Sequence, residues 1–239
     1  MAQELWPGGP LFNEDSDIFR LGIDSVLLAH FAKATGLRKN RRAADLGCGS
    51  GFLSVLLAWE NSGLHIDAID IQPNAAALAL ENAAVNGLAD RITVIEGDLR
   101  CIRELLKPGV YDLVVSNPPY YTSGGGKRPA GTGAAIARSE EMCTLGDVCK
   151  AAGYLTRWGG SFVLVHKPER LAEVFRCLSE NGLEPKRVRF VSHMSSSPPN
   201  LVLIEARRGG KPSLKFEAPI VLFSSDGTET DEVRAICKR

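Results

Sequence analysis

Asp45-Leu46-Gly47-Cys48-Gly49-Ser50-Gly51 decides the fold of this 239-residue chain. The stretch follows a predicted strand, Arg42–Asp45, and opens a predicted helix, Phe52–Trp59. Its glycines let the backbone turn tightly and lie against a ligand without interference from Cβ atoms, and the free N–H groups of the helix start would face that ligand. The dinucleotide fingerprint Gly-x-Gly-x-x-Gly needs a wider glycine spacing, so a pyrophosphate cradle is a poor match.

Short apolar runs alternate with helical patterns between about residues 42 and 207, which predicts βαβ units and a mainly parallel sheet. The other predicted strands are His65–Asp70, Ile92–Glu96, Val110–Ser116, Ser161–His166, Val188–Ser192 and Leu201–Arg207. The other predicted helices are Pro73–Asn86, Leu145–Trp158 and Glu169–Asn181. We therefore predict an α/β fold with a mostly parallel seven-stranded sheet and helices on both faces.

Two shorter parts flank the predicted domain at residues 42–208. Residues 1–41 read as a cap segment with an amphipathic helix over Ser25–Thr35. Residues 209–239 read as a C-terminal extension that begins with a Gly-Gly-Lys-Pro linker and ends in a short helical pattern.

Composition narrows the class of protein. No segment approaches the roughly 20 apolar residues that span a bilayer, and Met1–Pro7 lacks the features of a signal peptide, so we expect a cytoplasmic protein without a membrane partner. The formal net charge of +0 gives no bulk sign of nucleic-acid binding. The six cysteines form no Cys-x-x-Cys pair, and no histidine lies near Cys143 or Cys149, which predicts free, mostly buried thiols and no metal.

Two acidic residues lie at the ends of later strands. Asp70 ends the second strand, where an acid can accept both hydroxyls of a ribose. Asp98 follows the third strand and can reach an adenine amino group. Each has a structural alternative, because Asp70 can cap the helix after Pro73 and Asp98 can cap a helix after Leu99. Ligands of open α/β sheets bind at the carboxyl ends of strands, so the whole set favours a nucleoside-bearing cofactor.

Asn117-Pro118-Pro119-Tyr120 follows the fourth strand. Alone, it reads as a turn that stops a strand. After the glycine turn and the two acids, it reads as a clamp for a planar amino group, with Asn117 Oδ1 and the Pro118 carbonyl as acceptors for the two N–H protons. The prolines hold the backbone rigid, and Tyr120 can stack on the planar group. No strongly basic side chain is required, because the proton can leave after the nitrogen has become cationic.

The segment after Tyr120 contains Lys127 and Arg128 among several glycines. It can close over a nucleotide that has swung out of a folded nucleic acid and contact its phosphates. The alternative is a disordered surface loop, and the sequence does not choose between them.

These motifs, in this order, resemble those of class I S-adenosyl-L-methionine-dependent methyltransferases, over about residues 45–207. The resemblance implies a Rossmann-like fold and a cofactor held at the strand ends. Its methionine part would lie over Gly47, Gly49 and Gly51, with Asp45 near the amino group. Asp70 would hold the ribose, Asp98 and Leu99 the adenine edge, and Asn117 would lie beside both cofactor and acceptor.

Enzymes with an Asn-Pro-Pro-Tyr motif methylate adenine in DNA, adenine or guanine amines in RNA, or a glutamine amide in release factors. Asp17–Phe31 is similar to the N-terminal segment of the bacterial tRNA1(Val) (adenine-37-N6)-methyltransferase family, which implies adenine N6 in a tRNA as the acceptor. Further similar segments are Ile71–Pro73, Ala137–Glu140, Leu201–Ala206 and Thr230–Val233. The family often has histidine where this chain has Ser139.

Other acceptors remain open: an rRNA base, a DNA adenine or a protein glutamine amide. The parts outside the predicted domain are shorter than the extra helical or recognition domains expected for the last two. A different class of protein, a module that binds S-adenosylmethionine without catalysis, would not need both Asn117 and Tyr120. A monomer is compatible with the sequence.

Overall fold

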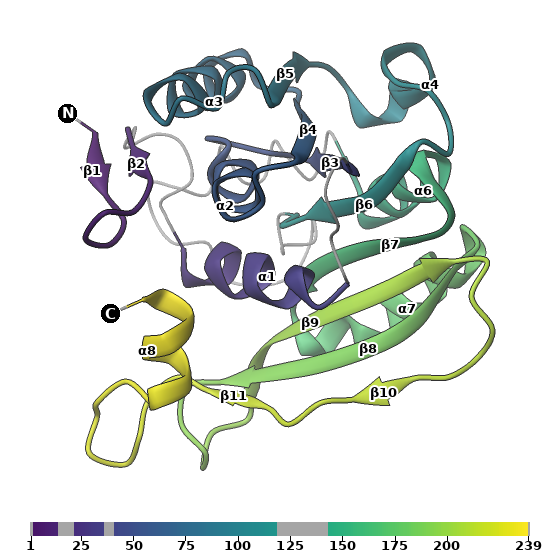
Figure 1. The fold of residues 1–239 in the computed structure, drawn as a ribbon. Helices are drawn as coiled ribbons and strands as arrows, with labels where there is room; N and C mark the ends of the chain where they lie inside the picture. The colour runs from purple at the N-terminus through teal and green to yellow at the C-terminus, as the bar shows by residue number, and fades with distance from the viewer. Residues whose placement is uncertain (1, 14–21, 36–40, 119–142, 239) are drawn as a thin grey trace, which may run out of the picture.

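The computed structural model describes residues 2–13, 22–35, 41–118 and 143–238. Its centre is a sheet in the order β10-β8-β9-β7-β6-β3-β4-β5, with β11 also paired to β8 (Figure 1). The strands are β3 (Arg41–Leu46), β4 (Leu64–Asp70), β5 (Ile92–Glu96), β6 (Tyr111–Ser116), β7 (Thr156–His166), β8 (Leu183–Ser192), β9 (Pro199–Arg208), β10 (Lys215–Phe216) and β11 (Ile220–Val221). Strands β3 to β7 are parallel, and β9 runs antiparallel between β7 and β8.

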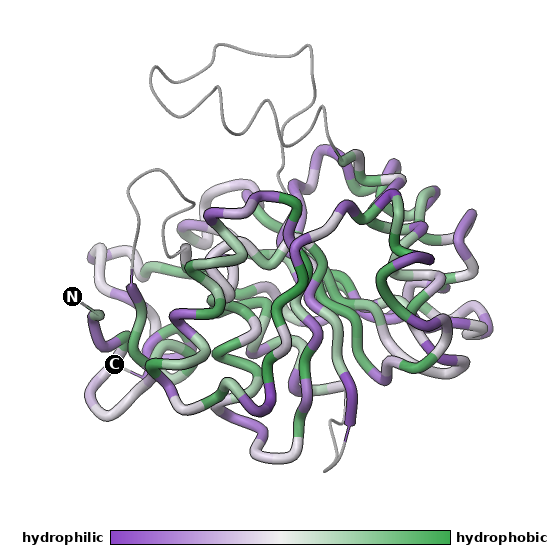
Figure 2. Tube along the Cα trace, turned by 90° about the horizontal axis from the view of Figure 1, so that it is seen from above, coloured by the Kyte–Doolittle hydropathy of each residue, from purple (hydrophilic) through white to green (hydrophobic). Residues whose placement is uncertain are grey.

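Helices cover both faces of this sheet. They are α1 (Ile23–Lys33), α2 (Phe52–Glu60), α3 (Pro73–Val85), α4 (Ile102–Leu105), α6 (Leu145–Leu155), α7 (Leu171–Glu180) and α8 (Asp231–Cys237), with short 3-10 turns η1 (Leu99–Cys101) and η2 (Pro168–Arg170). One apolar core lies under α1, α2, α3 and α8, and the other under α4, α6 and α7. Ala43 contributes to the first and Ala44 to the second, because successive strand residues point to opposite faces. Seen from above, the inner strands are largely hydrophobic (Figure 2).

The predicted fold class is confirmed, and the predicted number of strands is wrong. The predicted strands are all present, but the described sheet has nine strands rather than seven. The additional strands, β10 and β11, lie in the C-terminal extension and pair in parallel with β8. Each has two residues, which is too short to produce a recognisable alternation in the sequence.

The predicted helix Leu145–Trp158 is also too long. Helix α6 ends at Leu155, and Thr156 already pairs with Tyr111 of β6. Thr156 is fully buried, and β-branched residues pack well in strands. Pairing with a strand distant in sequence therefore overrides the helical pattern.

The N-terminal residues are attached to α3. A short hairpin of β1 (Gln3–Glu4) and β2 (Leu11–Phe12) is held by two asparagine side chains. Asn86 donates to the Leu11 carbonyl and accepts from its N–H at 2.7 and 2.8 Å. Asn82 accepts from the Asn13 N–H at 2.8 Å and donates to the Ser50 carbonyl at 3.0 Å. The N-terminal segment is thereby linked to the glycine turn.

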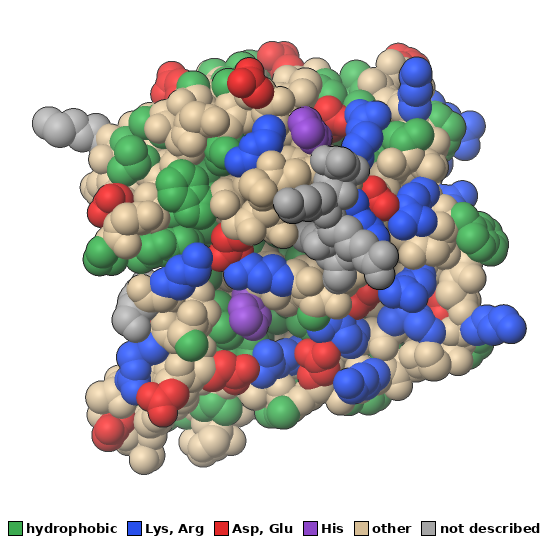
Figure 3. All heavy atoms as spheres, in the orientation of Figure 1, with side chains coloured by type: hydrophobic (Ala, Val, Ile, Leu, Met, Phe, Trp, Pro, Cys, Tyr) green, Lys and Arg blue, Asp and Glu red, His purple; other side chains and the backbone are tan. Residues whose placement is uncertain are grey.

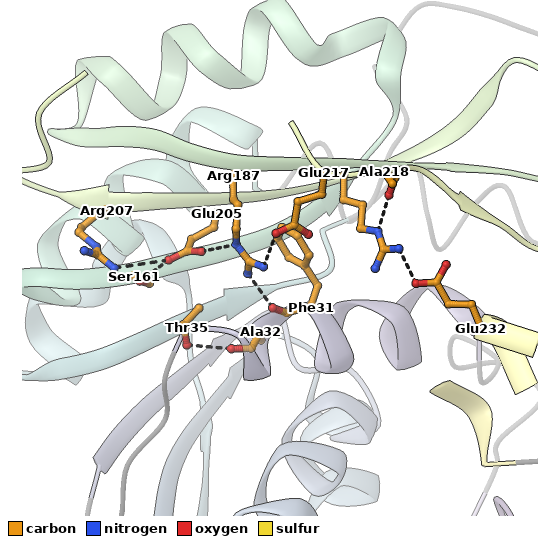
Figure 4. A network of polar contacts seen from close by, with 11 residues as sticks. Phe31, Ala32, Thr35, Ser161, Arg187, Glu205, Arg207, Glu217, Ala218 and Glu232 are labelled. Carbon is orange, nitrogen blue, oxygen red and sulfur yellow. Dashed lines mark hydrogen bonds and ion pairs between the residues drawn. The ribbon is translucent and has the colours of Figure 1, made fainter. Parts of the chain in front are cut away.

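The C-terminal extension is attached through Arg187 of β8 (Figure 4). Its guanidinium donates to Glu205 at 2.7 Å, to Glu217 at 3.0 Å and to the Phe31 carbonyl of α1 at 2.8 Å, and lies 3.9 Å from the centre of the Phe31 ring. Nearby, Arg189 donates to the Ala218 carbonyl and to Glu232 of α8. Hydrogen bonds therefore join the extension, β8 and α1.

None of the helices in the described ranges is both long enough and apolar enough to cross a membrane. Cys48, Cys149 and Cys177 are buried free thiols, as predicted, and Cys237 is also buried, whereas Cys101 is exposed. On the face shown in Figure 3, basic and acidic side chains are intermixed.

Replacing Arg187 with alanine should strongly destabilise the protein. The Glu205 side chain is only 6% exposed and would lose its buried cation, which typically costs about 3–5 kcal/mol. The measurement is the free energy of unfolding in urea. Arg234→Ala, which removes a more exposed pair with Asp231, is the control and should have a much smaller effect. Equal effects of the two substitutions would contradict the role given to Arg187.

Candidate functional site

The predicted site residues lie at the carboxyl ends of the parallel strands. Asp45 belongs to the end of β3, Asp70 ends β4, Asp98 follows β5 by two residues, and Asn117 directly follows β6. Because the sheet order is β6-β3-β4-β5, these residues follow one another in space as Asn117, Asp45, Asp70 and Asp98. The chain reverses its direction of travel across the sheet between β3 and β6, and such switch points are where α/β sheets bind ligands.

The glycine turn is shaped by hydrogen bonds to β4. The N–H groups of Gly47 and Cys48 both donate to the Ile69 carbonyl at 2.9 Å. The Gly49 N–H donates to Asp70 Oδ2 at 2.8 Å. The backbone of Gly47, Gly49 and Gly51 has φ angles of 73°, 54° and 74°, a region that favours glycine.

The three glycines serve different purposes. A Cβ atom on Gly51 would lie 2.9 Å from the Ala79 Cβ, so this glycine allows α2 to approach α3. A Cβ atom on Gly47 or Gly49 would meet nothing within 4 Å. The turn therefore presents bare backbone to open space at Gly47 and Gly49, which suits a bound ligand.

Asp45 is a buried carboxyl behind this turn. It is 1% exposed and accepts a hydrogen bond from Ser54 Oγ of α2 at 2.7 Å. Burial raises the pKa of Asp45 to about 7, and the nearby charge of Asp70 adds to this, while the Ser54 bond opposes it. A cationic amine beside Asp45 would favour the ionised carboxylate.

Asp70 is built into the turn. It is 6% exposed, and its second oxygen accepts from the Gln72 N–H at 3.0 Å. Burial raises the pKa of Asp70, against the effect of the hydrogen bonds from Gln72 and Gly49. The N-cap of α3 is Gln72, so Asp70 is not the cap of that helix.

Asp98 does cap the following turn, which was its structural alternative. It accepts from the Arg100 N–H at 2.8 Å, and the Arg100 guanidinium binds the same carboxylate with a shortest distance of 2.6 Å. These hydrogen bonds lower the pKa of Asp98. A nucleobase amine that bound Asp98 would therefore share the carboxylate with Arg100, while the adjoining Leu99 is buried.

Asn117 is held from a distant part of the chain. Its Nδ2 donates to Ser25 Oγ of α1 at 3.0 Å. The preceding Ser116 donates to the Leu46 carbonyl at 2.7 Å, which joins the ends of β6 and β3. Pro118 is buried. Tyr120, Lys127 and Arg128 lie outside the described residues, so their predicted roles stay predictions.

Sequence reasoning missed Ser25, Ser54 and Ser116. Each is a buried hydroxyl that contacts a predicted site residue or its strand. Serine is common on helices and strands. Ser25 lies within Asp17–Phe31, the segment that resembles the tRNA1(Val) family, but nothing in that segment marks Ser25 itself as a contact of Asn117. Only the spatial arrangement identifies them.

An open groove of about 810 Å³ lies elsewhere, between η1, α4, α6 and the end of α7. Of the predicted site residues it includes Leu99 alone. Within the described ranges, no three His, Cys, Asp or Glu side chains gather in a way that would hold a metal ion.

The fold and this strand-end site define a class I S-adenosylmethionine-dependent methyltransferase. The chain belongs to the methyltransferase small domain family, whose model matches residues 21–170. The tRNA1(Val) (adenine(37)-N6)-methyltransferase of Aeromonas hydrophila is 33% identical over 92% of this chain and 90% of its own length. That of Parabacteroides distasonis is 32% identical over 80% of this chain and 78% of its own length.

Solved structures confirm the fold. One described as a predicted O-methyltransferase from Agrobacterium tumefaciens has a TM-score of 0.71 and 19% identity, and covers 90% of this chain and 95% of its own. Geranyl diphosphate C-methyltransferase from Streptomyces coelicolor has a TM-score of 0.56 and 14% identity, over 76% and 80%.

Alanine at Gly49 and at Gly51 should have separable effects. Both positions have positive φ, which costs about 1–2 kcal/mol for alanine. Gly51→Ala adds a clash with Ala79 and should mainly lower the free energy of unfolding. Gly49→Ala should raise the dissociation constant for S-adenosylmethionine at least about tenfold, or ~1.4 kcal/mol, because its methyl group would enter the open space beside the turn. Calorimetry measures the dissociation constant, and urea unfolding measures the stability. Unchanged cofactor affinity in Gly49→Ala would contradict the assignment.

Cofactor affinity should depend on the ionisation of Asp45. Because the pKa in the free protein is about 7, affinity for the cationic cofactor should rise as pH increases from 5.5 to 7.5. The stability of the free protein should change in the opposite direction, because folding favours the protonated Asp45 carboxyl. This contribution to stability is fully present below the ordinary pKa of 3.8 and is lost as the pH rises through the raised pKa of about 7. Asp45→Asn should flatten both profiles. A wild-type affinity that is independent of pH over this range would contradict the prediction.

Proposed function

We propose that this protein transfers a methyl group from S-adenosylmethionine to the exocyclic N6 of an adenine in tRNA. The observation that carries the proposal is the position of Asn117, which lies at the end of β6 beside the glycine turn that ends β3. The names of the relatives from Aeromonas hydrophila and Parabacteroides distasonis support the choice of acceptor.

The residues present fit the cofactor. Bare backbone at Gly47 and Gly49 leaves room for its methionine part, and Asp45 is a buried carboxyl suited to an ammonium group. Asp70 lies next along the sheet edge for the ribose, followed by Asp98 and Leu99 for the adenine edge. When bound, the cofactor supplies an electrophilic sulfonium methyl group.

The acceptor side requires orientation rather than a base. The lone pair of an adenine N6 amine is delocalised into the ring. Hydrogen bonds from both N–H protons to Asn117 Oδ1 and the Pro118 carbonyl would favour a pyramidal nitrogen with its lone pair directed at the methyl group. Once the N–CH3 bond has formed and the S–CH3 bond has broken, leaving a neutral thioether, the methylated nitrogen is cationic and would lose a proton to water. Tyr120 would stack on the base, and Lys127 and Arg128 would meet the flanking phosphates.

The decisive experiment uses purified protein, labelled S-adenosylmethionine and tRNA from cells that lack the gene. Mass spectrometry of the digested nucleosides should show N6-methyladenosine. Parallel reactions offer rRNA, DNA or a glutamine-containing release factor in place of tRNA, and label in one of these without label in tRNA would replace the proposed acceptor. Cofactor binding without transfer to any of these acceptors would favour a non-catalytic module.

Asn117→Ala should remove most methyl transfer while leaving cofactor affinity nearly intact, because it removes an acceptor for the reacting amine. A loss of about 10²–10³ in kcat is typical for removal of one such group. Asp70→Ala is the matched comparison and should weaken cofactor binding first, since it also releases the Gly49 N–H. Activity of Asn117→Ala equal to wild type would rule out the proposed role.

A further inference from the structure

The amide of Asn117 is held by a residue 92 positions earlier in the chain. Asn117 Nδ2 donates to Ser25 Oγ at 3.0 Å, and Ser25 is 7% exposed. Ser25 lies in the first turn of α1, whereas Asn117 follows β6. Ser25 has no role in the methyl transfer described above.

The orientation of this amide matters chemically. One arm of the planar group is an acceptor and the other is a donor. Only Oδ1 can accept a proton from an amino group, and a flipped amide would place N–H against N–H. Because Nδ2 is the arm that binds Ser25, the opposite arm of the amide is the acceptor.

Ser25 belongs to a helix that is held at its other end. Arg187 donates to the Phe31 carbonyl at 2.8 Å and lies 3.9 Å from the centre of its ring (Figure 4). Lys33 pairs with Glu60 of α2 at 2.6 Å. Helix α1 is thus fixed to β8 of the sheet and to α2. Because the helix is held in place, Ser25 can impose a position on Asn117.

We propose that Ser25 is a positioning residue for methyl transfer, which fixes the Asn117 amide with its carbonyl arm toward the acceptor amine. This inference rests on the proposed function of the same site. It assigns α1, which lies outside the glycine turn and the strand ends, a direct part in the geometry of the reaction.

The test compares Ser25→Ala, Ser25→Cys and Ser25→Thr. Alanine and cysteine should lower kcat about tenfold, since a misplacement of about 1 Å can cost about 10²-fold and the loss of one positioning contact should displace the amide by less. Cysteine has the shape of serine with a larger atom in place of oxygen, but its sulfur is a weak acceptor, so it controls for the cavity that alanine would leave. Threonine retains the hydroxyl and should restore most of kcat. The KM for S-adenosylmethionine should stay near the wild-type value in all three variants.

A double-mutant cycle separates positioning from a structural role. In an Asn117→Ala background, Ser25→Ala should cause no further loss of kcat, because Ser25 acts only through Asn117. Additive losses, or a wild-type kcat in Ser25→Ala and Ser25→Cys, would overturn the proposal.

A second measurement does not depend on activity. With ¹⁵N-labelled asparagine, the Asn117 side-chain signal is identified by its absence in Asn117→Ala. Ser25→Cys should shift this signal and speed exchange of its protons, and Ser25→Thr should not. An unchanged signal in Ser25→Cys overturns the role of Ser25. If the wild-type protein transfers no methyl group to tRNA while Ser25→Cys shows the expected shift, the proposed function is overturned and the contact between Ser25 and Asn117 stands.

Discussion

The hydrogen bond from the Gly49 N–H to Asp70 is the interaction on which the site depends. It joins the turn after β3 to the last residue of β4, next to the two bonds that the Ile69 carbonyl receives. The turn can follow this path because its glycines adopt positive φ. The open backbone surface for the cofactor follows from this, because Asp70 holds the turn by its hydrogen bond while Gly47 and Gly49 carry no side chain.

Two buried carboxyls, beside the glycine turn, favour the binding of a cation there. Asp45 and Asp70 are almost completely buried, and burial raises the pKa of both. Ionised carboxylates are unfavourable in such buried surroundings, and both lie close to the exposed backbone of the glycine turn. A cationic ligand would offset the cost of ionising them, so the electrostatics of the fold favour a positively charged cofactor.

The flanking parts of the chain complete the same structure. The N-terminal hairpin reaches the glycine turn through Asn82, and α1 reaches Asn117 through Ser25. The C-terminal extension adds two strands to β8 and binds α1 through the Arg187 cluster. Segments that read as a cap and an extension therefore support the residues to which we assign the chemistry.

The sequence by itself determined the strand and helix order, the glycine turn and the acids at the strand ends. These features depend on local periodicity and on residues that are close together in the chain. The tertiary structure alone decided that β10 and β11 join the sheet, that α6 stops at Leu155, and that Ser25 meets Asn117. Each of these depends on a partner far away in sequence, and a two-residue strand or a single serine leaves no periodic pattern that could reveal that partner.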